Sequence, residues 1–191
     1  AGRVLKLSGT NLIVRQKKDS KPKGLVKLAM GYGSGHEGPG AGAVRPGGMD
    51  LGIPGDIFAA PAANRILRGL QEIDDGSPIL LCVTNHTGDE LNSRLAVQMA
   101  QAKGIDVSMH IIYDDVASAP KERIRDRRAI GSVYNVMGMM AEWGEDVSEI
   151  LRVGEKTNQY TRSFGVGIRS AIHPVSGLPI MEMPEDEIEL G

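Results

Sequence analysis

An imidazole and a carboxylate stand side by side in a glycine-rich segment. His36 and Glu37 close the stretch 31–37, which directly follows the apolar run 25–30. Glycine tolerates positive φ angles and lets a ligand approach bare backbone N–H groups. Ten of the chain's 25 glycines lie in 31–55, interleaved with apolar residues that favour burial rather than with the serine and lysine of a flexible linker. We therefore predict that this segment is a site loop.

Polar residues also follow the next two apolar runs, 78–83 and 107–113, which are predicted to be buried strands. In open α/β sheets, ligands bind at the carboxyl ends of the strands. Histidine and carboxylate side chains that meet there are suited to general acid–base chemistry. Four such side chains are expected to converge on one side of the sheet: His36, His86, Asp89 and Asp114.

The aspartates have simpler interpretations as well. Asp89 is suited to be the N-cap of the helix that follows, and capping is compatible with catalysis, so both roles stay open. At least one of Asp114 and Asp115 is expected to be a cap or a solvated turn residue.

Three other reactive residues are predicted to be structural. His110 lies in the middle of a predicted strand, and His173, directly before Pro174, lies in a predicted loop. Cys82 is either a nucleophile or a small buried hydrophobe in a central strand. No electropositive neighbour in the sequence would activate its thiol, which favours the structural role.

Strands and helices alternate along the chain. Between the strands 78–83 and 107–113, apolar residues recur at helical spacing, and Gly104 closes the segment. Buried strands are predicted at 25–30, 78–83 and 107–113, and helices at 62–73, 89–103, 128–140 and 146–159. Short strands are predicted at 11–15 and 164–168, while 185–190 is either an edge strand or a tail.

This order predicts an α/β fold, a layered domain with a central, largely parallel or mixed sheet flanked by helices. The sequence shows neither a repeat nor a domain boundary. Residues 1–191 are therefore predicted to form a single α/β domain.

Composition excludes several classes of function. Hydrophobic content of 41% and charged content of 24% are typical of a globular protein. A net charge of −2 and 4% aromatic residues argue against nucleic-acid and anionic-membrane partners. No apolar run approaches the roughly 18 residues of a membrane span. A single cysteine cannot form an internal disulfide, which favours a cytoplasmic location, and zinc-type Cys/His spacing is absent, so no metal site is expected.

Several short motifs follow one another along the chain. They are G-Y-G-S-G-H-E at 31–37, G-D-I-F-A-A-P at 55–61, T-N-H-T-G-D at 84–89, D-D-V-A at 114–117, R-R at 127–128, T-R-S-F-G-V at 161–166 and E-I-E-L-G at 187–191. Each motif is modest alone, but the series resembles dihydroxyacetone kinase. The resemblance is to the amino-terminal half of its substrate-binding subunit and covers about 24–191.

The resemblance implies a phosphotransferase that phosphorylates a terminal hydroxyl of a small ketose such as dihydroxyacetone. In that family the backbone of the glycine–serine loop holds the substrate, which corresponds here to Gly33, Ser34 and Gly35. The loop histidine and the aspartate of the T-G-D motif form the acid–base pair. These correspond to His36 and to Asp89, which would accept the proton of the attacking hydroxyl.

The sequence departs from the family pattern at three points. Thr84 stands where the family has a substrate-contacting lysine, and this removes a cation and its N–H donors. Gly38 replaces a proline. The family also has a second domain whose histidine binds the substrate carbonyl covalently, and no residue here matches it. These departures favour an alternative function, a non-catalytic ketose-binding regulator or co-activator related to the kinase.

The resemblance also implies partners. No cofactor is expected on this chain, because no phosphate-binding G-x-x-x-x-G-K-[ST] loop is present. The phosphoryl donor, ATP with Mg²⁺ or a phosphotransferase-system protein, is expected on a separate domain or subunit. A homodimer is expected, and a second substrate-domain chain is a possible source of the missing histidine. The charged run 114–128 is either the docking surface for the donor component or a solvated helix face.

Overall fold

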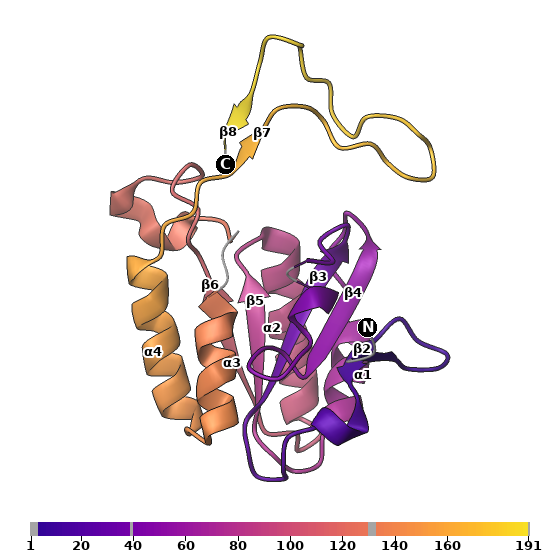
Figure 1. Cartoon of the computed structure of the whole chain (residues 1–191), viewed down its shortest axis with the longest axis vertical. Helices are drawn as coiled ribbons and strands as arrows, with labels where there is room; N and C mark the ends of the chain where they lie inside the picture. Colours follow the sequence, from indigo (N-terminus) through magenta and orange to yellow (C-terminus); the bar gives the residue numbers. More distant parts are fainter. Residues whose placement is uncertain (1–3, 39, 130–132, 191) are drawn as a thin grey trace.

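A computed structural model describes residues 4–38, 40–129 and 133–190 of the chain (Figure 1). Its centre is a six-stranded sheet with the strand order β1-β2-β4-β3-β5-β6. The strands are β1 (Val4–Lys6), β2 (Ile13–Arg15), β3 (Lys27–Ser34), β4 (Leu51–Ile57), β5 (Ile79–Thr84) and β6 (Val107–Ile112). Strands β4, β3, β5 and β6 are parallel, while β2 and β1 extend the β4 edge in antiparallel pairing. The predicted α/β fold with a mixed central sheet is confirmed.

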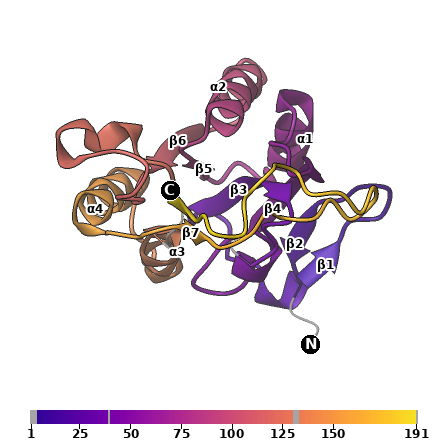
Figure 2. The same cartoon turned by 90° about the horizontal axis from the view of Figure 1, so that it is seen from above.

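Helices cover both faces of the sheet. Helices α1 (Ala63–Ile73) and α2 (Thr87–Gln101) lie on one face, and α3 (Val133–Trp143) and α4 (Val147–Tyr160) on the other (Figure 2). Among the described residues, no helix has the length and apolar character needed to cross a membrane.

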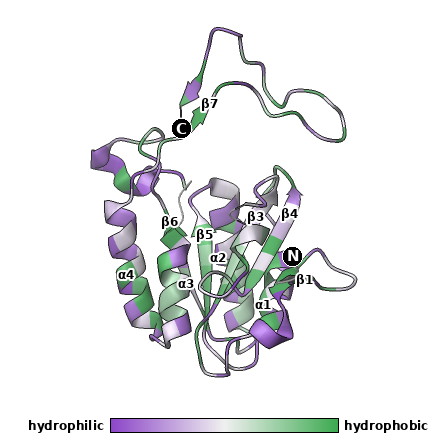
Figure 3. Cartoon of the chain, in the orientation of Figure 1, coloured by the Kyte–Doolittle hydropathy of each residue, from purple (hydrophilic) through white to green (hydrophobic). Residues whose placement is uncertain are grey.

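The sequence of β5 shows how the two faces are built. Leu81 and Val83 pack toward α1 and α2, while the alternate residues Leu80 and Cys82 pack toward α3 and α4. Because successive side chains of a strand point to opposite faces, a strand covered on both sides must be apolar throughout. Figure 3 shows this as green along β5 and mixed colours on the outer helices. The strands predicted from such runs are therefore present.

The glycine-rich segment differs from the prediction of a site loop. Strand β3 continues to Ser34, and Leu51–Ile57 forms a further parallel strand beside it. Gly31 pairs with Ile53 in this ladder. A Cβ atom on Gly55 would lie 2.1 Å from the carbonyl oxygen of Ala59. These glycines thus serve close backbone packing within a sheet, as well as a turn.

The boundaries of two helices also differ. Helix α2 begins at Thr87, two residues before the predicted start at Asp89. Residues 127–129 are not helical, and α3 is described from Val133; residues 130–132 of the predicted helix lie outside the described residues. Strand β1 was not predicted, because three residues carry too little periodicity to identify it.

The C-terminal arm (161–190) stands beyond the carboxyl edge of the parallel strands and crosses above the sheet in the view from above (Figures 1 and 2). The predicted strands 164–168 and 185–190 shorten to β7 (Val166–Gly167) and β8 (Glu189–Leu190), which pair with each other. Most of the arm is exposed.

Candidate functional site

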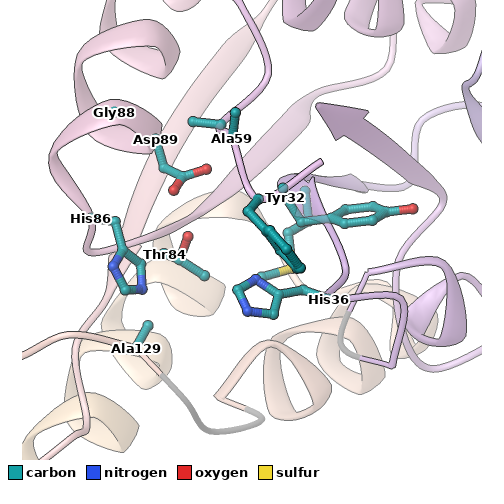
Figure 4. Close-up of a pocket in the computed structure, with 12 residues that line it drawn as sticks. Tyr32, His36, Ala59, Thr84, His86, Gly88, Asp89 and Ala129 are labelled. Carbon is teal, nitrogen blue, oxygen red and sulfur yellow. The ribbon is translucent and has the colours of Figure 1, made fainter. Parts of the chain in front are cut away.

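A cavity of about 690 Å³ opens at the carboxyl edge of the parallel strands (Figure 4). The ends of β3, β4 and β5, the first turn of α2 and the segment before α3 contribute its walls. The lining residues are Met30, Tyr32, Gly33, His36, Phe58, Ala59, Ala60, Thr84, His86, Gly88, Asp89 and Ala129. Because these parallel strands end at one edge of the sheet, segments far apart in sequence meet there.

Asp89 supplies the carboxylate of this cavity. It is the third residue of α2, and the N-cap is His86, so the capping role left open for Asp89 is wrong. Its Oδ1 atom is buried and has no hydrogen-bond partner among the described residues. Burial raises the pKa of Asp89, while His86, the Thr84 hydroxyl and His36 act in the opposite direction. A carboxylate with a raised pKa and a free oxygen is suited to accept a proton from a ligand.

His36 reaches the same cavity from the opposite wall. It follows β3 in a turn in which its backbone N–H donates to the carbonyl oxygen of Gly33 at 3.2 Å. Figure 4 shows its ring facing the wall formed by Thr84, His86 and Asp89. An imidazole and a carboxylate thus flank one space, as the sequence predicted for the segments 31–37 and 84–89.

Only part of the glycine–serine loop lines the cavity. Gly33 lines the cavity, whereas Ser34 and Gly35 are not among its lining residues. The Ser34 hydroxyl donates to the carbonyl oxygen of Gly55 at 2.7 Å and so ties β3 to β4. The Gly35 N–H, expected to hold a substrate, donates to the Glu37 carboxylate at 3.0 Å. A substrate bond to Gly35 would therefore require Glu37 to give way.

Gly35 also shows why glycine is needed at its position. It adopts a φ of 116°, and a Cβ atom there would lie 2.7 Å from the ring of Phe58. Phe58 has a φ of 57°, an uncommon conformation for a residue with a side chain. Its ring forms part of the cavity wall and meets His173 of the C-terminal arm edge-on, with 6.1 Å between ring centroids.

Sequence reasoning missed much of the apolar wall. Tyr32, Phe58, Ala59 and Ala60 line the cavity, and three of them directly follow the unpredicted strand β4. The motif G-D-I-F-A-A-P at 55–61 contains three of these residues and could have indicated them, but on its own it supports only the family resemblance.

Asp114 does not join the site, so its predicted convergence with the other three residues is wrong. Asp114 and Asp115 are both buried, so neither is a solvated turn residue, but Asp115 caps the turn that follows it, as one of the two was expected to do. Their backbone N–H groups both donate to the carbonyl oxygen of Arg128, and Asp115 Oδ1 accepts from the Ala117 N–H at 3.0 Å. The chain after β6 therefore turns toward the segment that precedes α3, rather than into the cavity.

The residues predicted to be structural are structural. His110 is buried in β6 with its Nε2 atom 3.1 Å from Asn158 Nδ2. Cys82 is fully buried in β5, and this burial raises the pKa of its thiol to about 12, which leaves it inert as a nucleophile. His173 lies in a loop of the C-terminal arm. No group of three or more His, Cys, Asp or Glu within the described ranges could hold a metal ion.

Comparisons with known proteins agree on one relationship. The Dak1 domain matches residues 2–191. The dihydroxyacetone-binding subunit of the PTS-dependent dihydroxyacetone kinase 1 of Listeria innocua is 35% identical over 191 residues, which cover 98% of this chain and 57% of that subunit. The chain thus spans little more than half the length of this relative.

Two solved structures share the fold. The dihydroxyacetone kinase from C. freundii in complex with AMP-PNP and Mg²⁺ has a TM-score of 0.81 and 30% identity, over 99% of this chain and 35% of that one. A dihydroxyacetone kinase operon co-activator has a TM-score of 0.85 over 99% of this chain and 58% of that one. Its identity of 22% establishes likeness of fold alone.

Proposed function

The chain belongs to the Dak1 domain family, and from this premise we propose that it is the substrate-binding component of a dihydroxyacetone-type kinase. The reaction is phosphoryl transfer to a terminal hydroxyl of a small ketose. One observation carries the proposal: Asp89 presents a buried, unpartnered carboxylate oxygen in a cavity that His36 also lines.

In the proposed reaction, the ketose lies between the wall of Asp89 and that of His36. Asp89 accepts the proton of the attacking hydroxyl, and His36 orients this hydroxyl or shuttles its proton. The raised pKa of Asp89 makes it a stronger base than an exposed aspartate. Thr84 offers its hydroxyl to the substrate. The backbone of Gly33, Ser34 and Gly35 holds the substrate from the strand end once Glu37 releases the Gly35 N–H.

The phosphoryl donor is ATP with Mg²⁺, or a phosphotransferase-system protein, on a partner domain or subunit. Positioning and electrostatic stabilisation dominate phosphoryl transfer, and the donor component supplies both around the phosphates. The chain works as a homodimer over which this component docks. The charged run 114–128 is the proposed contact, and Arg125 in this run pairs with Glu155 at 2.7 Å.

We place this protein in the cytoplasm and treat residues 1–191 as one domain of the substrate-binding component. The single cysteine, Cys82, is buried in the sheet as a free thiol, so the fold does not require an oxidising compartment.

A second candidate function is a non-catalytic ketose-binding regulator. The observation in its favour is Thr84, which stands where the kinase pattern has a substrate-contacting lysine. A fold can keep a pocket and lose its chemistry. The presence of both His36 and Asp89 in the cavity favours the kinase.

The test is reconstitution. The purified chain mixed with ATP, Mg²⁺ and dihydroxyacetone should give no phosphorylated ketose, and addition of a donor component from the same organism should start turnover. Turnover by the chain alone would contradict the need for a partner. Ketose binding without phosphorylation by any donor component would support the regulator instead.

A further inference from the structure

His86 has no role in the reaction proposed above, yet it occupies the centre of the site. It is the N-cap residue of α2 and lines the main cavity on the same wall as Thr84 and Asp89 (Figure 4). It also lines a second cavity of about 570 Å³ on the side of Arg125 and Arg128. His86 therefore borders both the proposed substrate space and a neighbouring, more polar cavity.

Burial of the ring and the backbone of Ala129 act in opposite directions on the pKa of His86. A hydrogen bond to the backbone of Ala129 favours the protonated ring, as expected when a ring N–H faces a carbonyl oxygen. Burial acts more strongly in the opposite direction and lowers the pKa of His86, so the ring is neutral near pH 7. A neutral imidazole that donates through one nitrogen has only an acceptor on the other.

This leaves a wall rich in hydrogen-bond acceptors. Asp89 contributes a carboxylate and His86 a ring nitrogen, while Thr84 brings a hydroxyl instead of a cation. Acceptors recognise hydroxyl groups, which can donate, and disfavour a carbonyl oxygen, which cannot. The chemistry of the wall therefore suits two neighbouring hydroxyl groups of a substrate.

We propose that His86 is a specificity-determining residue that accepts a hydrogen bond from a second substrate hydroxyl, on the carbon next to the one that is phosphorylated. This inference rests on the proposed kinase function. It selects a ketose with a vicinal diol at its reacting end, such as erythrulose, over dihydroxyacetone. In dihydroxyacetone, the carbon next to each hydroxyl-bearing carbon is the carbonyl carbon, so an acceptor at His86 finds no donor there.

Acidification should weaken this preference, because a protonated His86 gains a donor that can serve a carbonyl oxygen. Charged and titratable groups of three segments either act on the pKa of His86 or line the second cavity with it, and all must be considered in a pH profile. They are Asp89 and Glu90 of α2, His36 after β3, and Arg125, Asp126 and Arg128 before α3.

The experiment measures binding of erythrulose and dihydroxyacetone to the 191-residue chain by calorimetry. The chain should bind erythrulose about 3–10-fold more tightly, the worth of one neutral hydrogen bond. His86→Phe keeps a ring but removes the acceptor and should abolish this ratio. His86→Gln keeps an acceptor and should retain most of it. Glu90→Gln, in the second cavity only, is the matched control and should leave the ratio unchanged.

A second readout separates contact from a structural effect. The ¹⁵N resonance of the unprotonated ring nitrogen of His86 should shift on addition of erythrulose and much less with dihydroxyacetone. Equal ratios in the parent chain and in His86→Phe would overturn the role of His86 while leaving the kinase proposal intact. Failure of both ketoses to bind would overturn the proposed function, and this inference with it.

Discussion

The two ends of the central sheet differ in whether their buried charged groups have partners. At the amino ends of β3 and β4, four charged side chains form the amino-edge ion cluster: Arg15, Lys21, Asp50 and Glu142. Lys21 Nζ donates to Asp50 Oδ2 at 2.9 Å and to the carbonyl oxygen of Val26 at 2.8 Å, and Arg15 donates to the carbonyl oxygens of Met49 and Gly48 and to Glu142. At the carboxyl edge, Asp89 keeps a buried oxygen without a partner.

The amino-edge ion cluster is satisfied within the chain, whereas Asp89 keeps a free carboxylate oxygen and lines a cavity. Buried ions are tolerated when each is paired and hydrogen-bonded, and breaking such a set leaves an uncompensated charge. The amino-edge ion cluster meets this condition within the chain itself. The Oδ1 atom of Asp89 does not meet it, although the Thr84 hydroxyl bonds the carboxylate, so a ligand hydroxyl would supply the missing hydrogen bond.

Removal of the basic carboxylate should have the largest effect. Asp89→Asn keeps the shape of the side chain, yet turnover by the reconstituted kinase should fall roughly 10²–10⁴-fold, the scale of general acid–base catalysis. Thermal stability should not fall. Burial raises the folded-state pKa of Asp89, so the ionised form costs stability above that pKa, and a neutral amide removes this cost.

The control for this variant is Glu90→Gln on the same helix, which should change turnover less than twofold. Steady-state kinetics and thermal unfolding of both variants give the result. Turnover of Asp89→Asn at the parent rate would exclude Asp89 as the base, and a large loss of stability would place it with the structural residues instead.

The opposite pattern is expected at the other end of the sheet. Asp50→Leu removes the partner of Arg15 and Lys21, whose side chains are almost fully buried. The free energy of unfolding should fall by about 3–5 kcal/mol, because the buried Lys21 loses its carboxylate partner and Arg15 keeps only Glu142. Urea denaturation measures this loss. Asp126→Leu, which removes an exposed pair with Arg123, should cost less than about 1 kcal/mol. Equal costs would show that the amino-edge ion cluster contributes nothing by burial.

The same two regions show what the sequence can predict. Strands β5 and β6 were identified because strands buried on both faces leave long apolar runs, and His36 and Asp89 were located because each directly follows such a strand. Strand β4 was hidden because its glycines resemble those of a loop, although Gly55 is required by the close approach of Ala59.

Other features depend on contacts between segments far apart in the sequence rather than on local composition. Asp114 follows a strand as Asp89 follows β5, but the chain then turns to bond with Arg128, and no local pattern encodes this turn. The pairing of Arg15 with Asp50 likewise requires the antiparallel contact of β2 with β4, a contact between segments separated by the whole glycine-rich region.

A cation introduced beside Asp89 should pair the carboxylate, as the cations at the amino edge pair Asp50. Its expected effect on activity is smaller than the effects of the two changes above. Because burial raises the pKa of Asp89 above its ordinary value of 3.8, the acidic limb of the pH–rate profile of kcat/KM should lie above pH 3.8. Thr84→Lys places an ammonium group beside the carboxylate, favours the ionised form, and should move this limb roughly one pH unit lower.

Thr84→Met, of similar length without a charge, is the control. Its acidic limb should stay in place or rise, since it also loses the Thr84 hydroxyl that acts on Asp89. A limb that does not respond to the lysine would mean that Asp89 is not the group that titrates in the rate. The free carboxylate oxygen would then mark a ligand contact rather than the catalytic base.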